Sequence, residues 1–323
     1  MKTVLLKAFS LIIAVPLTVI LFIAAPGTYE HPLATIINKV SMIRSTTPPR
    51  IILVGGSEVL VGVNSEMIYR KFGRTVVNMA VYGGFGISDM LHLVGPRIGR
   101  GDIIVIIPEY SVFKRSFDSE DICYKWILLA DPRYALEKIY LGQGRYPSLV
   151  ADVSDLLQCK IEGMWGMLWK GRNPFTDGAA AYERRSNRFG DLMKNWEYVP
   201  AEKLGDRGQV FSHGPIDPAI IRTLNDFHAA AARKGASVYL AFSGFPEGEY
   251  RLNHDEIESM ADQLRKSLGF PVLGAPSDTL FPYEMFSNTI YHLRFEGRDR
   301  RTAALVRNME KANIKPPGRS DAR

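Results

Sequence analysis

The stretch RIILVGGS at residues 50–57 decides the predicted fold. An unbroken apolar run of this length that ends at two glycines is typical of a strand buried on both faces. The glycines allow a tight turn into the next element. Four further apolar runs lie at residues 75–81, 103–107, 237–242 and 270–273. The chain is therefore expected to form a sheet of five buried strands.

Helical patterns fill the stretches between these strands. They span residues 64–72, 88–98, 220–234 and 254–268, and Asn64 is a favourable N-cap for the first of them. Strands that alternate with helices predict a mainly parallel sheet covered on both faces. We therefore predict an α/β fold, a three-layer α/β/α sandwich around a mainly parallel five-stranded sheet.

The N-terminus predicts attachment to a membrane. Lys2 and Lys7 precede an uncharged, apolar run over residues 8–25, and about 20 such residues are enough to cross the hydrocarbon core as a helix. We assign residues 1–27 to a membrane anchor, with residues 4–25 in the lipid bilayer. Because the lysines precede the span, the N-terminus should stay in the cytoplasm and the rest of the chain should lie outside.

A cleaved signal peptide is the alternative to an anchor. Signal peptides usually have an apolar stretch of about 7 to 15 residues that ends in a small-x-small cleavage site. Here the run is longer, and Ile23 would occupy position −3 for a cut after Ala25. Residues 28–49, which include Ser, Thr and Pro in close succession, are predicted to link the anchor to the globular domain.

The composition is that of a packed globular protein, with 323 residues of which 46% are apolar and 23% are charged. The net charge is +6, but residues 294–323 contain nine basic and four acidic side chains, so the rest of the chain is nearly neutral. A basic face for nucleic acid is therefore not expected.

Residues 313–323 are predicted to form a flexible basic tail. The basic side chains of this tail are expected either to be solvated or to contact anionic lipid headgroups.

About a hundred residues between the third and fourth strands, 113–211, break the alternation. We interpret them as a mainly helical insertion, which leaves 50–112 and 212–312 as the α/β domain. Insertions of this kind usually lie near the ends of the strands, so this one is expected to shape a cleft or to dock on the membrane.

Cys123 and Cys159 allow either a disulfide or two buried thiols. Neither has metal-ligand spacing, and we expect no metal and no cofactor.

Chemistry is expected at the carboxyl ends of the strands. Ser57, directly after the first strand and before a helix, is the candidate nucleophile. A serine after glycines is also a frequent turn or helix cap, so its role depends on other features. Gly83, five residues after Asn78, offers a backbone amide beside Ser57. His292 lies in a loop before the last predicted helix, which begins near Arg300.

The order and spacing of these residues resemble the SGNH, or GDSL-like, hydrolase family. That family has a flavodoxin-like fold, a serine after the first strand, an Asn-x-x-x-x-Gly block after the second, and a histidine before the final helix. The chain is similar over about residues 50–308, the insertion excluded. The resemblance implies that Ser57 is the nucleophile and that His292 takes its proton. It also implies that the backbone amides of Ser57 and Gly83 stabilise the oxyanion.

Two positions depart from this pattern. The family has an acid three residues before the histidine, where this chain has Thr289 beside Asn288. An asparagine carbonyl can still orient an imidazole, so Asn288 is the candidate third member. The asparagine that follows the third strand in the family has no match in Glu109 and Tyr110, which we assign to a substrate cleft together with Asn78. An ionised Glu109 would repel an oxyanion.

The resemblance implies a membrane-anchored serine esterase or O-acyltransferase that acts on acyl groups, such as acetyl, of a cell-envelope polysaccharide. The implied location is the bacterial inner membrane, crossed once, with the C-terminal domain in the periplasm. The implied partners are the polysaccharide or an acyl donor, the lipid bilayer and a membrane acyltransferase. One alternative is an inactive relative that binds polysaccharide or a membrane partner. Another is a phosphate-binding module around residues 55–57, which lacks the expected lysine or acidic cluster.

Overall fold

The computed structural model describes residues 2–25, 29, 31–114, 117–142, 146–173, 186–193 and 200–316. The chain divides into two compact units, which consist of residues 1–37 with 124–184 and of residues 38–123 with 185–323.

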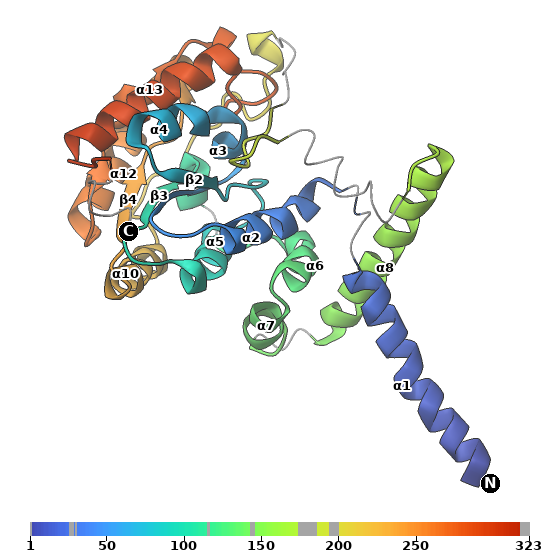
Figure 1. Ribbon diagram of the computed structural model, residues 1–323. Helices are drawn as coiled ribbons and strands as arrows, with labels where there is room; N and C mark the ends of the chain where they lie inside the picture. Colours follow the sequence, from blue (N-terminus) through green and yellow to red (C-terminus); the bar gives the residue numbers. More distant parts are fainter. Residues whose placement is uncertain are drawn as a thin grey trace. The chain divides into compact units, whose positions relative to one another are not determined.

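A parallel sheet forms the centre of the larger unit, with five strands in the order β2-β1-β3-β4-β6 (Figure 1). Its strands are β1 (Arg50–Gly55), β2 (Thr75–Asn78), β3 (Ile103–Ile107), β4 (Ser237–Ala241) and β6 (Val272–Leu273). The pairings of β1 with β2 and β3, of β3 with β4, and of β4 with β6 are all parallel. The prediction of an α/β fold with a five-stranded parallel sheet is confirmed.

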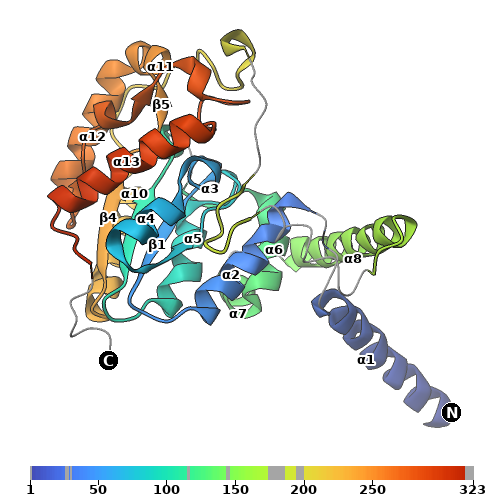
Figure 2. The ribbon, with the colours of Figure 1, turned by 45° about the horizontal axis from the view of Figure 1, so that its top comes forward.

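Helices cover both faces of this sheet. The helices of the larger unit include α3 (Ser57–Gly62), α4 (Ser65–Phe72), α5 (Ile87–Val94), α10 (Pro218–Arg233), α11 (Glu247–Leu252), α12 (His254–Ser267) and α13 (Phe295–Lys311). Figures 1 and 2 show α3, α4 and α13 on one face, and Figure 1 shows α5 and α10 on the other. The final helix begins earlier than predicted and includes Gly297. A Cβ atom there would lie 3.1 Å from Met285 O, so the glycine allows a close approach.

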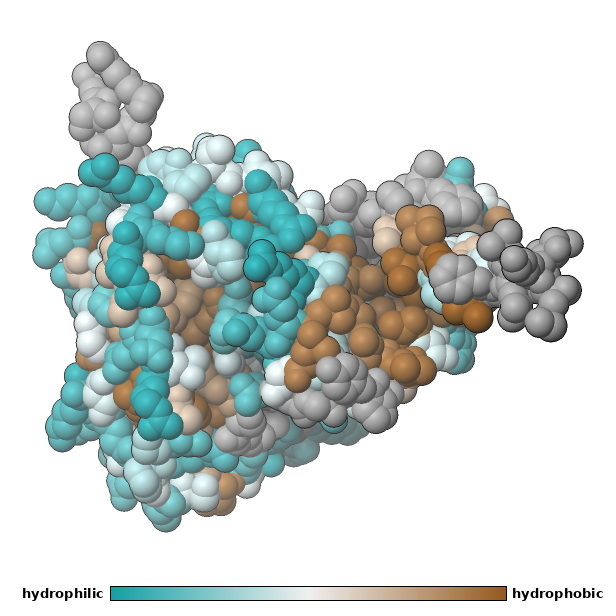
Figure 3. Space-filling view, turned by 90° about the horizontal axis from the view of Figure 1, so that it is seen from below, coloured by the Kyte–Doolittle hydropathy of each residue, from teal (hydrophilic) through white to brown (hydrophobic). Residues whose placement is uncertain are grey.

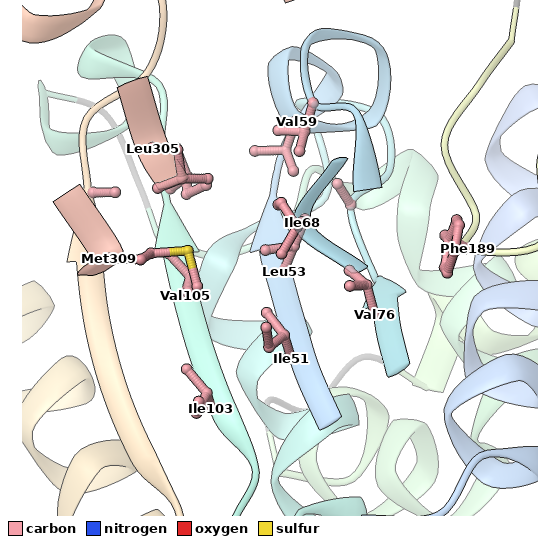
Figure 4. Close-up of a cluster of buried hydrophobic side chains, with 14 of the residues drawn as sticks. Ile51, Leu53, Val59, Ile68, Val76, Ile103, Val105, Phe189, Leu305 and Met309 are labelled. Carbon is pink, nitrogen blue, oxygen red and sulfur yellow. The ribbon is translucent and has the colours of Figure 1, made fainter. Parts of the chain in front are cut away.

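The core between the sheet and α3, α4 and α13 is built from alternate positions of the strands (Figure 4). Ile51 and Leu53 of β1 lie beside Ile103 and Val105 of β3, and α13 contributes Met309. Successive strand residues point to opposite faces, which is why only every second one joins this cluster. Burial of each such side chain contributes roughly 1.5–3 kcal/mol. All six residues of β1 are buried, as expected for a central strand.

In the smaller unit, α1 (Lys2–Ala24) contacts α8 (Tyr146–Trp169). Lys160 of α8 donates hydrogen bonds to Ile23 O (3.1 Å) and Ala25 O (2.5 Å), and so it satisfies carbonyls at the end of α1 that lack a helical partner. Within the described residues, no helix is long and apolar enough to cross a membrane. The predicted N-terminal span therefore remains a prediction.

The segment predicted as a linker contains a helix, α2 (Thr35–Ser45). Ile36, Val40 and Ile43 are spaced to share one helix face, and all three are buried. Sequence reasoning gave more weight to the Ser-Thr-Pro cluster that follows this helix than to its apolar spacing.

The two cysteines, Cys123 and Cys159, are both free thiols. Of the predicted tail, residues 317–323 lie outside the described part of the chain.

The buried ion pair between Arg50 and Asp102 offers a test of this packing. Arg50 Nη2 lies 2.7 Å from Asp102 Oδ2, and both side chains are almost fully buried. Removal of one member of a buried pair leaves an uncompensated charge. Asp102→Ala is expected to lower the free energy of unfolding by about 3–5 kcal/mol, measured by urea denaturation. Glu296→Gln, which breaks an exposed pair with Arg300, should cost less than about 1 kcal/mol. Equal losses would contradict this account.

Candidate active site

Ser57 begins α3 directly after the central strand, and its side chain is partly buried. The two glycines before it are required by close contacts. A Cβ atom at Gly55 would lie 2.5 Å from Ile107 O, and one at Gly56 would lie 3.3 Å from Gly83 Cα. The glycines therefore allow the loops that follow β1, β2 and β3 to meet at one edge of the sheet.

His292 reaches Ser57 from a loop just before α13. The loop is closed by backbone hydrogen bonds from Ser287 N to His292 O (2.8 Å) and from Arg294 N to Met285 O (2.7 Å). His292 Nε2 lies 2.7 Å from Ser57 Oγ. The two residues that the sequence placed at the same sheet edge are thus within hydrogen-bond distance.

Asn288 holds the other side of the imidazole. Its Oδ1 lies 2.8 Å from His292 Nδ1 and also accepts a hydrogen bond from Ser287 Oγ (3.0 Å). Since this amide oxygen is an acceptor, Nδ1 carries the proton and Nε2 is free to accept the hydroxyl proton of Ser57. Thr289, at the position of the family's acid, instead accepts a hydrogen bond from Tyr291 N (3.2 Å).

A cavity of about 480 Å³ opens over this pair. It is lined by Ser57 and His292, by Gly83 from the loop after β2, by Glu109 from the loop after β3, and by Asp206. The predicted oxyanion residues therefore border the same cavity as the candidate nucleophile. Among the described residues, no group of three or more His, Cys, Asp or Glu side chains is arranged to hold a metal ion.

Two residues predicted for the cleft lie elsewhere. Asn78 is fully buried, where its Nδ2 donates to Asp191 Oδ1 (2.9 Å) and its Oδ1 accepts from Ala80 N (3.0 Å). Tyr110 is also buried, with its ring against Phe245. Because both side chains turn into the protein interior, neither lines the cavity. Asn78 secures the turn after β2 rather than meeting a ligand.

Sequence reasoning missed Asp206. It lies in a turn that is attached to the histidine loop by hydrogen bonds from Gly205 N to Asn288 O (2.9 Å) and from Ile290 N to Gly205 O (3.2 Å). Asp206 has a φ of 62°, in the left-handed region that residues other than glycine seldom adopt. No motif marks this residue, since it reaches the site only through pairing with a distant part of the chain.

The environment of His292 favours the neutral imidazole. Burial lowers the pKa of His292 from its ordinary 6.5 to about 4, and the nearby Asp206 carboxylate opposes part of this effect. At neutral pH the ring is therefore uncharged, as a general base must be before it accepts a proton. The same burial makes the imidazolium costly to form.

Glu58, the residue after the candidate nucleophile, is a second group that the sequence did not reveal. It is buried, and its Oε1 accepts a hydrogen bond from Gly56 N (3.2 Å). A Cβ atom at Gly56 would lie 2.7 Å from Glu58 Oε2 and 3.1 Å from Glu109 Oε1. Because Gly56 has no side chain, the carboxyl groups of Glu58 and Glu109 can both occupy the space next to it.

In comparisons with known proteins, no family model matches this chain and no curated protein matches it. Its chemistry is therefore argued from the site.

The titration of His292 tests the geometry directly. The NMR signals of its ring should titrate near pH 4 in the wild type. Asn288→Asp should move the midpoint upward, because a carboxylate beside Nδ1 stabilises the imidazolium. Asp206→Asn should move the midpoint downward. Glu284→Gln, an exposed substitution outside the cavity lining, should leave the midpoint unchanged. A wild-type midpoint near 6.5 would contradict the burial argument.

Proposed function

We propose that this protein is a serine esterase or O-acyltransferase, similar to SGNH hydrolases, that works through an acyl-serine at Ser57. The observation that carries the proposal is the hydrogen-bonded series from Ser57 Oγ to His292 Nε2 (2.7 Å) and from Nδ1 to Asn288 Oδ1 (2.8 Å). A nucleophile, a base and a group that orients the base are the minimum needed for this chemistry. Ser57 also lies at the carboxyl end of a central parallel strand, which is where ligands usually bind in such sheets.

The chemistry proceeds in two halves. His292 takes the Ser57 proton as Oγ attacks the acyl carbonyl, and the C=O electron pair moves onto oxygen. The tetrahedral intermediate collapses, the alcohol leaves with the proton from His292, and the acyl group stays on Oγ. Water or a sugar hydroxyl then attacks the acyl-serine with His292 again as base. Amides of Ser57 and Gly83 would donate to the oxyanion, and each such donor is typically worth about 3–4 kcal/mol.

The neutral Asn288 sets the expected rate. It orients the ring but cannot stabilise the imidazolium by charge, and the Asp-to-Asn change in a serine protease triad lowers the rate about 10⁴-fold. Asp206 supplies some negative charge from another direction. We therefore propose a slow enzyme.

The proposed setting is the bacterial inner membrane, with the α/β domain in the periplasm and an envelope polysaccharide or an acyl donor as substrate. A membrane acyltransferase is the proposed protein partner.

Support for a lipid contact comes from the smaller unit. On α8, Ile161, Trp165, Leu168 and Trp169 have the spacing of one helix face and are all exposed. Figure 3 shows that exposed apolar residues form patches on the face of the molecule that it draws.

An inactive binding protein is the second candidate function. The neutral Asn288 and the Glu109 carboxyl in the cavity favour it, because both weaken catalysis. A cavity with polar groups on its wall would still bind a sugar polymer or a membrane partner.

A fluorophosphonate probe separates the two candidates. The wild-type protein should be labelled at Ser57, and Ser57→Ala should abolish labelling. Asn288→Asp should increase the hydrolysis of small acetyl esters and move the acidic limb of the kcat/KM profile upward from about pH 4. Asn288→Ala is the matched control and should lower the rate, since it removes the hydrogen bond without adding charge. No labelling of either the wild type or Asn288→Asp would favour the binding protein.

The membrane contact can be tested with the chain's own tryptophans. In full-length protein added to vesicles of brominated lipid, variants that retain only Trp165 or only Trp169 should be quenched. These side chains are 68% and 94% exposed, and indole rings favour the interface. A variant that retains only the buried Trp126 is the control and should not be quenched. Vesicle-bound protein without quenching of Trp165 and Trp169 would contradict contact through α8.

A further inference from the structure

The carboxyl groups of Glu58 and Glu109 form a contact that requires a proton. A Cβ atom at Gly56 would lie 2.7 Å from Glu58 Oε2 and 3.1 Å from Glu109 Oε1, so the two carboxyl groups face the same small space. Burial, and after it the neighbouring Glu109 carboxyl group, raises the pKa of Glu58 well above its ordinary value. No donor from the described residues reaches Glu58 Oε2, although that atom is buried. Two ionised carboxylates could only repel each other, so one of them must donate.

A buried cation lies beside the pair and stabilises negative charge on Glu58. Arg301 of α13 is fully buried near Glu58, and its two Nη atoms have no hydrogen-bond partner among the described residues. Burial lowers the pKa of Arg301 to about 10, so it stays charged at neutral pH. Tyr110 and Tyr291 also lie near the pair, and burial raises the pKa of both, so they stay neutral. The other titratable side chains that line the cavity with Glu109 are Asp118, Glu120, Asp206 and His292.

The pair also lies where a reacting carbonyl would be polarised. Glu109 lines the cavity together with Ser57 and Gly83, whereas Glu58 lies beneath it. A Cβ atom at Gly83 would lie 3.3 Å from Glu109 Oε1, so this carboxyl group borders the backbone of a predicted oxyanion donor. When the proton is on Glu109, the charge on Glu58 is stabilised by Gly56 N and by Arg301.

We propose that Glu58 and Glu109 share one proton and that Glu109 offers it as a hydrogen bond to the carbonyl oxygen of the acyl substrate. This inference rests on the proposed function. It removes the repulsion expected of Glu109, because a neutral carboxyl group is a donor and not a competing anion. No bond to this proton is broken over the cycle. As Ser57 attacks, the electron pair of the C=O bond moves onto oxygen, which accepts the hydrogen bond, and the proton remains on the pair when the intermediate collapses.

Infrared difference spectra test the shared proton without any need for activity. At neutral pH the wild-type protein should show the C=O stretch of a protonated carboxyl group. This band should be lost in Glu58→Gln and shifted or lost in Glu109→Gln. The exposed Glu284→Gln is the control and should retain it. Absence of the band in the wild type would overturn the shared proton.

The donor role is tested by pH profiles of ester hydrolysis and of probe labelling. Wild-type kcat/KM should fall at alkaline pH as the pair loses its proton. Glu109→Gln, whose amide is a permanent donor, should remain within about tenfold of the wild type and lose this alkaline limb. Glu109→Ala should lower kcat by about 10²–10³, the usual loss for one oxyanion donor.

Two outcomes overturn the proposal separately from the proposed function. If Ser57 is labelled but Glu109→Gln retains the wild-type profile, the pair is not the donor. If Glu109→Gln is instead more than tenfold faster at neutral pH, Glu109 is an ionised, repelling group. If the wild type is not labelled at all, the proposed function itself fails and the donor role fails with it, whatever the infrared spectra show.

Discussion

The parallel pairing of β1 with both of its neighbours determines where the groups of the candidate site lie. Leu53 is opposite Asn78 of β2 and Val105 of β3, so the three strands reach the same sheet edge together. Ser57, Gly83 and Glu109 lie in or next to the loops that follow these strands, and they border one cavity because of this register. Parallel strands with both faces covered leave this edge as the natural place for a ligand.

The electrostatics of the site depend on burial. A buried imidazole is neutral and ready to accept a proton, but its charged form is poorly stabilised when the group beside it is an amide. Asp206 and the carboxyl pair of Glu58 and Glu109 lie on different sides of the site. Asp206 lies near His292, where the proposed mechanism would place positive charge, and Glu109 of the pair borders Gly83. Asn288 and Glu109 stand at the two positions where the chain departs from the SGNH pattern that it resembles, and Asp206 lies near His292.

The apolar runs were enough to predict the strands. The order of Ser57, Gly83 and His292 along the chain was enough to predict that they lie at one edge of the sheet. Asn288 was found because it adjoins Thr289, the position at which the SGNH resemblance expects an acid, and it lies in the same loop as His292. Asp206 was not found, because it reaches the site through backbone pairing between segments far apart in the chain. The side chains of Asn78 and Tyr110 were misplaced, because a position at a strand end does not reveal whether a side chain turns inward.

Trapping of the acyl-enzyme tests the central claim most directly. The purified full-length protein would be mixed with an activated acetyl ester, quenched in acid within the first turnover, digested and analysed by mass spectrometry. A slow enzyme whose Ser57 Oγ is activated by His292 should carry one acetyl group on the peptide that contains Ser57. His292→Ala should carry none. Turnover of the ester with no acyl group on Ser57, or an acyl group on another residue, would contradict the account.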